Sequence, residues 1–297
     1  MTGAHGEFKA RRLTVTIDGG EAALLRFGRP GAPPLLFAHA NGFCASAYRR
    51  MFVESGDAFD IFATDLRGHG LTRLPVAIKG HRSLAIFGED LRRTKAALAV
   101  HTGQARWTLA GHSLGGVAAL KAAAGDQSVA AVRLIEPVAM PRSWNLIAAS
   151  PLWPLIAPRI PLVQAAARRR DRWPDRASAL QSYDRKAFFA GWAPGVLADY
   201  LEDGLAPDGD GVRLSCAPAW EAANFAAQAN DLWGALARTA APVGVLAARH
   251  SSSTLRGDAE ARFRRAGATV ERVDGPTHLV PFEAPALAAK FLAAATR

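Results

Sequence analysis

The chain has 297 residues, of which 49% are hydrophobic, and a formal net charge of +10. A chain of this length can form one large domain with an inserted segment, and its composition excludes an intrinsically disordered protein. Its two cysteines, Cys44 and Cys216, are far apart and match neither a disulfide framework nor the spacing of metal ligands.

The distribution of apolar and basic residues narrows the protein class further. Residues 1–12 contain no apolar stretch of signal-peptide length, and no run of about 18 apolar residues predicts a transmembrane helix. Together with the scattered cysteines, this favours a cytoplasmic protein without stable membrane insertion. No basic stretch interleaved with aromatic residues marks a nucleic-acid module, so we expect no nucleic-acid partner. The densest basic cluster, residues 168–172, is expected to face water, with an anionic substrate as the alternative.

The first part of the chain alternates predicted strands and helices. Apolar runs and turn signals, including a hairpin turn at Asp18-Gly19-Gly20, predict strands over 13–17, 22–27, 35–38, 60–64, 107–110 and 129–135. Helices are predicted over 48–54, 85–100 and 114–124. This alternation predicts an α/β fold with a mostly parallel central sheet and helices on both faces.

The pattern changes near Pro141. From there to about Trp233 the chain is rich in Pro, Trp and Arg, its strand signals are weak, and it holds six of the seven tryptophans. Alternation then resumes, with strands predicted over 243–247 and 269–273 and helices over 255–266 and 284–295. We therefore expect one α/β core, residues 1–140 and 238–297, interrupted by a mostly helical cap, residues 141–237.

The strongest local signal is a serine flanked by glycines. Gly111-His112-Ser113-Leu114-Gly115 follows an apolar strand and precedes a helix of small residues. A tight strand-to-helix turn of this kind holds the serine in a strained conformation that only glycine-sized neighbours tolerate. The hydroxyl then lies at the carboxyl edge of the sheet, beside a helix N-terminus whose free N–H groups suit the oxyanion of acyl transfer. Ser113 is therefore the candidate nucleophile.

With this motif, the chain resembles the α/β-hydrolase family over nearly all of its length outside the inserted segment. Three further segments carry the resemblance: His39-Ala40-Asn41-Gly42-Phe43, Asp65-Leu66-Arg67-Gly68-His69-Gly70, and Pro276-Thr277-His278-Leu279-Val280-Pro281-Phe282-Glu283. The first departs from the family pattern, because Ala40 stands where the first glycine of the oxyanion loop usually lies. The resemblance implies an α/β-hydrolase fold with a helical cap over Ser113, and a reaction without a cofactor or a metal.

The resemblance also implies roles for single residues. Ser113 would attack a carbonyl carbon, and His278 would accept its proton and return it to the leaving group. The backbone N–H of Leu114 would be one oxyanion donor. The other would come from Asn41, with Phe43 as the second choice.

The acid of the expected triad is missing from its usual place. The predicted strand 243–247 is followed by His250, and no carboxylate occurs before Asp258. In some members of the family the acid follows the preceding core strand, where this chain has Glu136. A carboxylate there can orient the imidazole and stabilise its charged form, so Glu136 is the predicted acid. Asp258, a dyad without an acid, and a purely structural Glu136 remain as alternatives.

The inserted segment suggests a substrate class. Phe43, His112 and Trp144 are candidates for substrate contact, although a histidine beside the nucleophile more often supports the motif structurally. Most cap aromatics are expected to pack within the cap, but together they favour a small-molecule substrate with an apolar or aromatic acyl group. Glu221 is a candidate for a polar contact between cap and core.

The leading hypothesis is a cofactor-free serine hydrolase that cleaves a carboxylic ester or related acyl bond through an acyl-enzyme on Ser113. Other chemistry at the same site stays open: C–C bond, amide or lactone hydrolysis, acyl transfer, or a haloperoxidase-like activity. A ligand-binding protein without turnover also stays open, because the acid is not in its usual place. The sequence does not predict the oligomeric state.

Overall fold

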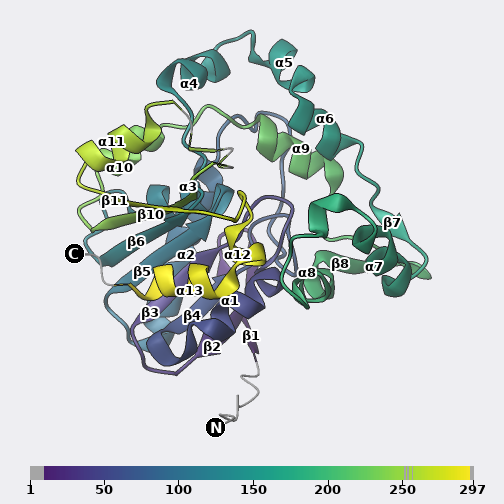
Figure 1. Ribbon diagram of the computed structural model, residues 1–297, viewed down its shortest axis with the longest axis horizontal. Coiled ribbons are helices and arrows are strands. Elements are labelled where there is room, and N and C mark those ends of the chain that lie inside the picture. Colours follow the sequence, from purple (N-terminus) through teal and green to yellow (C-terminus); the bar gives the residue numbers. More distant parts are fainter. Residues whose placement is uncertain (1–9, 251, 253, 256, 295–297) are drawn as a thin grey trace.

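The main sheet has eight strands in the order β1-β2-β4-β3-β5-β6-β10-β11 (Figure 1). The computed structural model describes residues 10–250, 252, 254–255 and 257–294. The strands are β1 (Arg11–Ile17), β2 (Gly20–Gly28), β3 (Pro34–Ala38), β4 (Asp60–Thr64), β5 (Trp107–His112), β6 (Val129–Ile135), β10 (Val243–Ala248) and β11 (Thr269–Val273). β2 is antiparallel to both neighbours, and every pair from β4 to β11 is parallel. The predicted α/β fold with a mostly parallel sheet is confirmed.

The side chains of the central strands are buried on both faces of this sheet. In β3, Leu36 belongs to one hydrophobic cluster, while Leu35 and Phe37 belong to the other. β10 alternates in the same way, with Val245 in the first cluster and Leu246 in the second. Successive residues of a strand point to opposite faces, so continuous apolar runs of this kind require helices on both sides.

Helices supply that cover. Residues of α2, α3, α10 and α11 belong to the first cluster, and residues of α1, α12 and α13 to the second. Their bounds are α1 (Arg49–Glu54), α2 (Ala85–Thr102), α3 (Leu114–Ala123), α10 (Leu232–Ala237), α11 (Ala259–Arg265), α12 (Val280–Glu283) and α13 (Pro285–Ala293). The predicted helices occur with ends that differ by a few residues, and α12 was not predicted. Residues 256 and 295 of the predicted helices lie outside the described residues.

Between β6 and α10 the chain leaves the main sheet. This segment forms α4 (Arg142–Ala149), α5 (Trp153–Ile156), α6 (Pro161–Ala167), β7 (Arg172–Trp173), α7 (Arg176–Asp184), α8 (Val196–Gly204), β8 (Leu205–Asp208), β9 (Gly211–Leu214) and α9 (Pro218–Ala226). Figure 1 shows it as an arc from α4 at the top to α7 at the right. Its small antiparallel sheet, β7-β9-β8, was not predicted, because strands of two to four residues are too short for a recognisable alternation.

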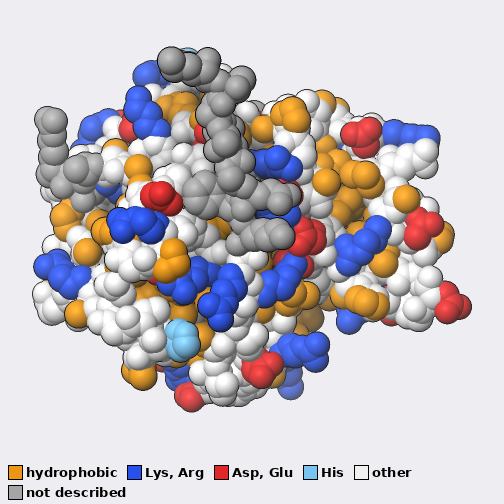
Figure 2. Space-filling view, turned by 90° about the horizontal axis from the view of Figure 1, so that it is seen from below, with side chains coloured by type: hydrophobic (Ala, Val, Ile, Leu, Met, Phe, Trp, Pro, Cys, Tyr) orange, Lys and Arg blue, Asp and Glu red, His pale blue; other side chains and the backbone are white. Residues whose placement is uncertain are grey.

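The surface carries charges of both signs. Figure 2 shows Lys and Arg side chains distributed over one face of the molecule, with Asp and Glu side chains between them. Several arginines are paired, such as Arg12 with Asp203 at 2.8 Å. No helix within the described ranges is both long and apolar enough to cross a membrane.

α3 lies close against the ends of β3 and β5. A Cβ atom at Gly115 would lie 2.0 Å from the carbonyl oxygen of Ala38, and one at Gly111 would lie 2.2 Å from the carbonyl oxygen of Gly115. Neither position has room for a side chain. The two glycines that flank Ser113 are therefore required by the packing of the helix on the sheet.

We expect Gly115→Ala to lower the free energy of unfolding by about 3 kcal/mol or more, because the helix would have to move away from β3. Gly116→Ala, one residue further along α3, is the matched control, since its nearest contact would be 3.3 Å away. That variant should lose less than about 1 kcal/mol, because alanine regains helix propensity. Urea unfolding of the two variants measures the difference. Equal losses would contradict this account of the packing.

Candidate active site

Ser113 forms the turn between β5 and α3. Its φ is 56° and its ψ is −113°, and Glu136 is the only other non-glycine residue in the described part of the chain with a positive φ. Such a conformation costs about 1–3 kcal/mol and persists only where the surroundings fix it. Here the Ser113 N–H donates to the carbonyl of Ile135 at 2.9 Å, and the Ser113 carbonyl accepts from the first turn of α3. The structure thus holds Ser113 at the carboxyl end of β5, as the motif predicts.

His278 lies between β11 and α12, with its ring against the residue that precedes Ser113. The ring centroids of His278 and His112 are 5.0 Å apart. Nδ1 of His278 lies 3.2 Å from Oε2 of Glu136, and since a carboxylate only accepts, Nδ1 carries the hydrogen and Nε2 is left as the basic nitrogen. Both Ser113 and His278 are described, and no hydrogen bond joins their side chains. Such bonds are commonly long in the absence of substrate.

Glu136 follows β6 directly and is fully buried, with a φ of 47°. Its Oε1 accepts the Ala248 N–H at 2.6 Å, and its Oε2 accepts from the hydroxyls of Ser252 at 2.8 Å and Thr254 at 3.0 Å, in addition to His278. Burial raises the pKa of Glu136, but the hydrogen bonds and charge of its partners, His278 foremost, outweigh it and place this pKa below its usual value of 4.5. The carboxylate is therefore ionised and oriented toward His278.

The other groups considered for the acid lie elsewhere. Asp258 precedes α11 and pairs with Arg262 at 2.6 Å on the surface. His250, at the usual position of the acid, has an 82% exposed side chain that faces Asp274. Of the carboxylates weighed from the sequence, only Glu136 contacts His278.

A chain of hydrogen bonds links the nucleophile strand, the 39–43 segment and the His278 backbone. The carbonyl of His278 accepts from Nε2 of His112 at 2.8 Å, which leaves Nδ1 of His112 as an acceptor for the Tyr48 hydroxyl at 2.8 Å. The Tyr48 oxygen in turn accepts the Ala40 N–H at 2.9 Å. His112 is completely buried and both of its nitrogens are used, so it supports His278 and offers no surface for substrate contact.

The predicted oxyanion donors are backbone N–H groups of two segments that are far apart in the sequence. Leu114 begins α3, so its N–H has no acceptor within the helix. The Asn41 N–H has no hydrogen-bond acceptor among the residues that the structure describes, whereas the Phe43 N–H donates to the Ala40 carbonyl at 3.2 Å. The Asn41 side chain is occupied by Glu221 and Asn224 of α9, which leaves the backbone N–H as the group that Asn41 can offer to an oxyanion.

An aromatic cluster connects the 39–43 segment, the inserted segment and the region after His278. Phe43 packs against Trp192, Tyr200 and Phe282, with ring centroids 5.8, 5.3 and 4.8 Å apart. Trp144, in contrast, packs edge-on against Trp153 at 5.5 Å, in a separate cluster of the inserted segment. The structure therefore packs Phe43 against Phe282, four residues after His278, and places Trp144 in a different cluster.

Arg169 corrects the expectation for the basic cluster at residues 168–172. The cluster was expected to face water, and Arg168, Arg170 and Arg172 are exposed. Arg169 instead turns inward: its Nη1 contacts Oε2 of Glu221 at 2.9 Å, and its Nη2 donates to the hydroxyls of Tyr183 and Tyr200, both at 2.8 Å. The expectation is wrong for Arg169 because a carboxylate and two phenol oxygens replace its hydration.

Tyr48, Arg169, Tyr200 and Asn224 also belong to this region, and no sequence pattern predicts that they do. Each acts through side-chain hydrogen bonds that form only in the folded protein, and no motif surrounds it. The sequence identifies Glu221 as a candidate for a polar contact between cap and core, and the structure places it in α9, buried and in contact with Asn41 and Arg169.

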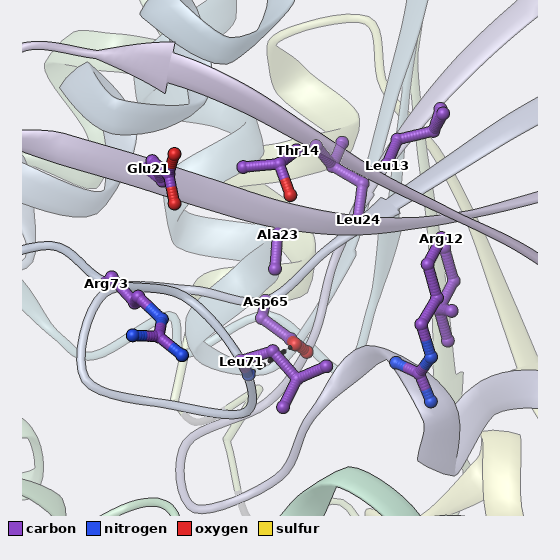
Figure 3. Close-up of a pocket in the computed structure, with 10 residues that line it drawn as sticks. Arg12, Leu13, Thr14, Glu21, Ala23, Leu24, Asp65, Leu71 and Arg73 are labelled. Carbon is purple, nitrogen blue, oxygen red and sulfur yellow. Dashed lines mark hydrogen bonds between the residues drawn. The ribbon is translucent and has the colours of Figure 1, made fainter.

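A hollow of about 370 Å³ lies elsewhere, between the β1–β2 hairpin and the segment after β4 (Figure 3). Asp65 forms part of its wall and accepts the Leu71 N–H at 2.8 Å. None of Ser113, His278 and Glu136 lines this hollow. Within the described residues, no group of three or more His, Cys, Asp or Glu side chains could hold a metal ion.

Solved structures share the fold. A crystal structure of E-2-(acetamidomethylene)succinate hydrolase has a TM-score of 0.75 and 22% identity, and the alignment covers 96% of this chain and 98% of that one. An enol-lactonase from Burkholderia xenovorans LB400 has a TM-score of 0.63 and 18% identity, with coverage of 95% and 100%. A thermophilic esterase from Thermogutta terrifontis has a TM-score of 0.65 and 19% identity, with coverage of 96% of both chains.

Sequence comparison gives the family. No curated protein matches the chain. The model of the alpha/beta hydrolase family, however, matches residues 35–291, which span the main sheet from β3 to β11 together with Ser113, Glu136 and His278. A match over this much of the chain shows that the protein is a hydrolase of the alpha/beta hydrolase family.

Proposed function

We propose that the protein is a serine hydrolase that cleaves a carboxylic ester or a related acyl bond through an acyl-enzyme on Ser113. The observation that carries this proposal is the contact between His278 and the buried Glu136 carboxylate, beside the strained turn of Ser113. A fully buried carboxylate that is ionised and held by four donors is costly unless it orients or stabilises a charged partner. His278 becomes such a partner when it takes the proton of Ser113.

The proposed reaction has two halves. Nε2 of His278 takes the Ser113 proton as Oγ attacks the carbonyl carbon, and the resulting oxyanion accepts from the N–H groups of Leu114 and Asn41. The intermediate collapses, the leaving group takes the proton from the imidazolium, and the acyl group stays on Oγ. Water then attacks the acyl-enzyme with His278 as the base and releases the acid. No step calls for a cofactor or a metal.

The substrate class rests on two supports. The aromatic cluster of Phe43, Trp192 and Phe282 favours a small molecule with an apolar or aromatic acyl group. The structural neighbours include an enol-lactonase, an esterase and a thioesterase domain, which supports a carboxylic ester or a related acyl bond as the substrate.

Cellular location is part of the same proposal. Cys44 and Cys216 are buried free thiols, as suits a reducing compartment such as the cytoplasm.

Ser113→Ala should abolish labelling by a fluorophosphonate probe and reduce hydrolysis of a short-chain p-nitrophenyl ester by about 10⁴ or more, because the acyl-enzyme can no longer form. Labelling is measured by intact-protein mass spectrometry. Wild-type protein that is neither labelled nor active would overturn the proposal and favour a ligand-binding protein of the same fold.

Glu136→Gln should lower kcat by up to about 10⁴, since glutamine cannot stabilise the imidazolium. Asp258→Asn is the matched control, because it makes the same carboxylate-to-amide change at a residue that pairs with Arg262 on the surface and does not contact His278. A Glu136→Gln variant within about threefold of wild type would exclude Glu136 as the acid. A comparable loss in Asp258→Asn alone would assign the acid there.

The charge of Glu136 can also be tested without substrate. Its pKa in the folded protein is below 4.5, so the unfolded chain takes up the proton first as the pH falls. The stabilisation is therefore complete above the unfolded pKa and is lost as the pH falls through the lower folded value. Urea unfolding between about pH 3 and 6 should show a shallower pH dependence in Glu136→Gln than in wild type. Identical slopes would mean that folding does not lower the pKa of Glu136.

A further inference from the structure

The inserted segment holds the side chain of Asn41 by both of its polar atoms. Nδ2 of Asn41 donates to the backbone carbonyl of Glu221 at 2.9 Å, and Oδ1 of Asn41 accepts from Nδ2 of Asn224 at 2.9 Å. Both partners belong to α9. His81 lies 2.9 Å from Oδ1 of Asn224 through its Nε2, which fixes the orientation of the Asn224 amide. All three side-chain contacts involve buried or half-buried atoms, so water does not easily replace them.

A second helix of the inserted segment holds the next residue. The Tyr200 hydroxyl in α8 donates to the carbonyl of Gly42 at 3.2 Å and accepts from Nη2 of Arg169. Arg169 also pairs with the carboxylate of Glu221, which lies directly over Gly42: a Cβ there would be 2.6 Å from Oε1 of Glu221. Arg169 therefore ties α8 and α9 together above residues 41–42.

These contacts bear on the direction of the Asn41 N–H. That N–H shares a peptide plane with the Ala40 carbonyl, which accepts from the Phe43 N–H at 3.2 Å and from Nδ1 of His39 at 2.7 Å. The Phe43 N–H in turn shares a plane with the Gly42 carbonyl that Tyr200 holds. Loss of the contacts from α8 and α9 would therefore let the peptide plane between Ala40 and Asn41 rotate. The direction of the Asn41 N–H, the candidate oxyanion donor, would change with it.

We propose that α8 and α9 position the oxyanion donor, with Asn224 and Tyr200 as positioning residues that act through Asn41 and Gly42. The inserted segment is then part of the catalytic arrangement and not only a cover that selects substrate. This inference rests on the proposed function, because an oxyanion forms only if Ser113 attacks a carbonyl carbon.

Kinetic variants test it. Asn224→Asp keeps an acceptor for His81 but removes the donor to Asn41, and Tyr200→Phe removes the donor to Gly42. Gln228→Glu is the matched control, since among the described residues its side-chain amide donates only to the Phe225 carbonyl, within the inserted segment. A single oxyanion donor contributes about 10²–10³ in kcat, so a misdirected donor should lower kcat by about tenfold or more in both variants. KM should stay within about twofold of wild type in all three proteins, with the kcat of Gln228→Glu unchanged.

A substrate-free measurement separates this inference from the proposed function. Hydrogen–deuterium exchange of a peptide spanning residues 39–44 should be faster in Asn224→Asp and Tyr200→Phe than in wild type and Gln228→Glu. Unchanged exchange in both variants, or a rise in KM at constant kcat, would overturn the inference while Ser113-dependent turnover remains. A wild type without Ser113-dependent turnover would overturn both proposals, whatever the exchange rates.

Discussion

The buried carboxylate of Glu136 is the contact on which the carboxyl edge of the sheet depends. It joins β6 to the end of β10 through Ala248, to the following segment through Ser252 and Thr254, and to His278. Because these partners come from different parts of the sequence, the side chain of Glu136 sets the relative position of the segments that follow β6, β10 and β11. An apolar residue there would leave buried donors without an acceptor, so the carboxylate is a structural requirement as well as a chemical one.

Strain is confined to the same edge. Ser113 and Glu136, the two described non-glycine residues with positive φ, end the adjacent parallel strands β5 and β6, and the Ser113 N–H bonds to Ile135 beside Glu136. The sheet thus holds two unfavourable backbone conformations next to each other. Strain of this kind needs rigid support, which the dense packing of Gly111 and Gly115 and the His112–Tyr48–Ala40 hydrogen bonds provide.

The parts that could be predicted depend on local patterns. Short stretches of sequence predict the buried strands, whose successive side chains belong to opposite hydrophobic clusters. They also predict the glycines around Ser113 and the position of Glu136 after β6. Arg169 shows where such patterns stop: its neighbours Arg168 and Arg170 have the same chemistry but face solvent, and only the folded position of Glu221, Tyr183 and Tyr200 distinguishes them. The role of Asn224 likewise depends on the packing of α9 against Asn41, which no periodicity of the sequence predicts.

The buried histidines around Ser113 make the stability of the folded protein depend on pH. Burial lowers the pKa of His39, of His112 and of His69, the last to about 4, so all three stay neutral and serve as hydrogen-bonding groups with fixed tautomers. The unfolded chain binds their protons first as the pH falls below 6.5, so each costs stability in that range. Asp65, whose pKa burial raises to about 7, opposes this loss, as does Asp199, whose pKa burial also raises. Each of the three neutral, hydrogen-bonded histidines around the nucleophile therefore contributes a loss of stability at acidic pH.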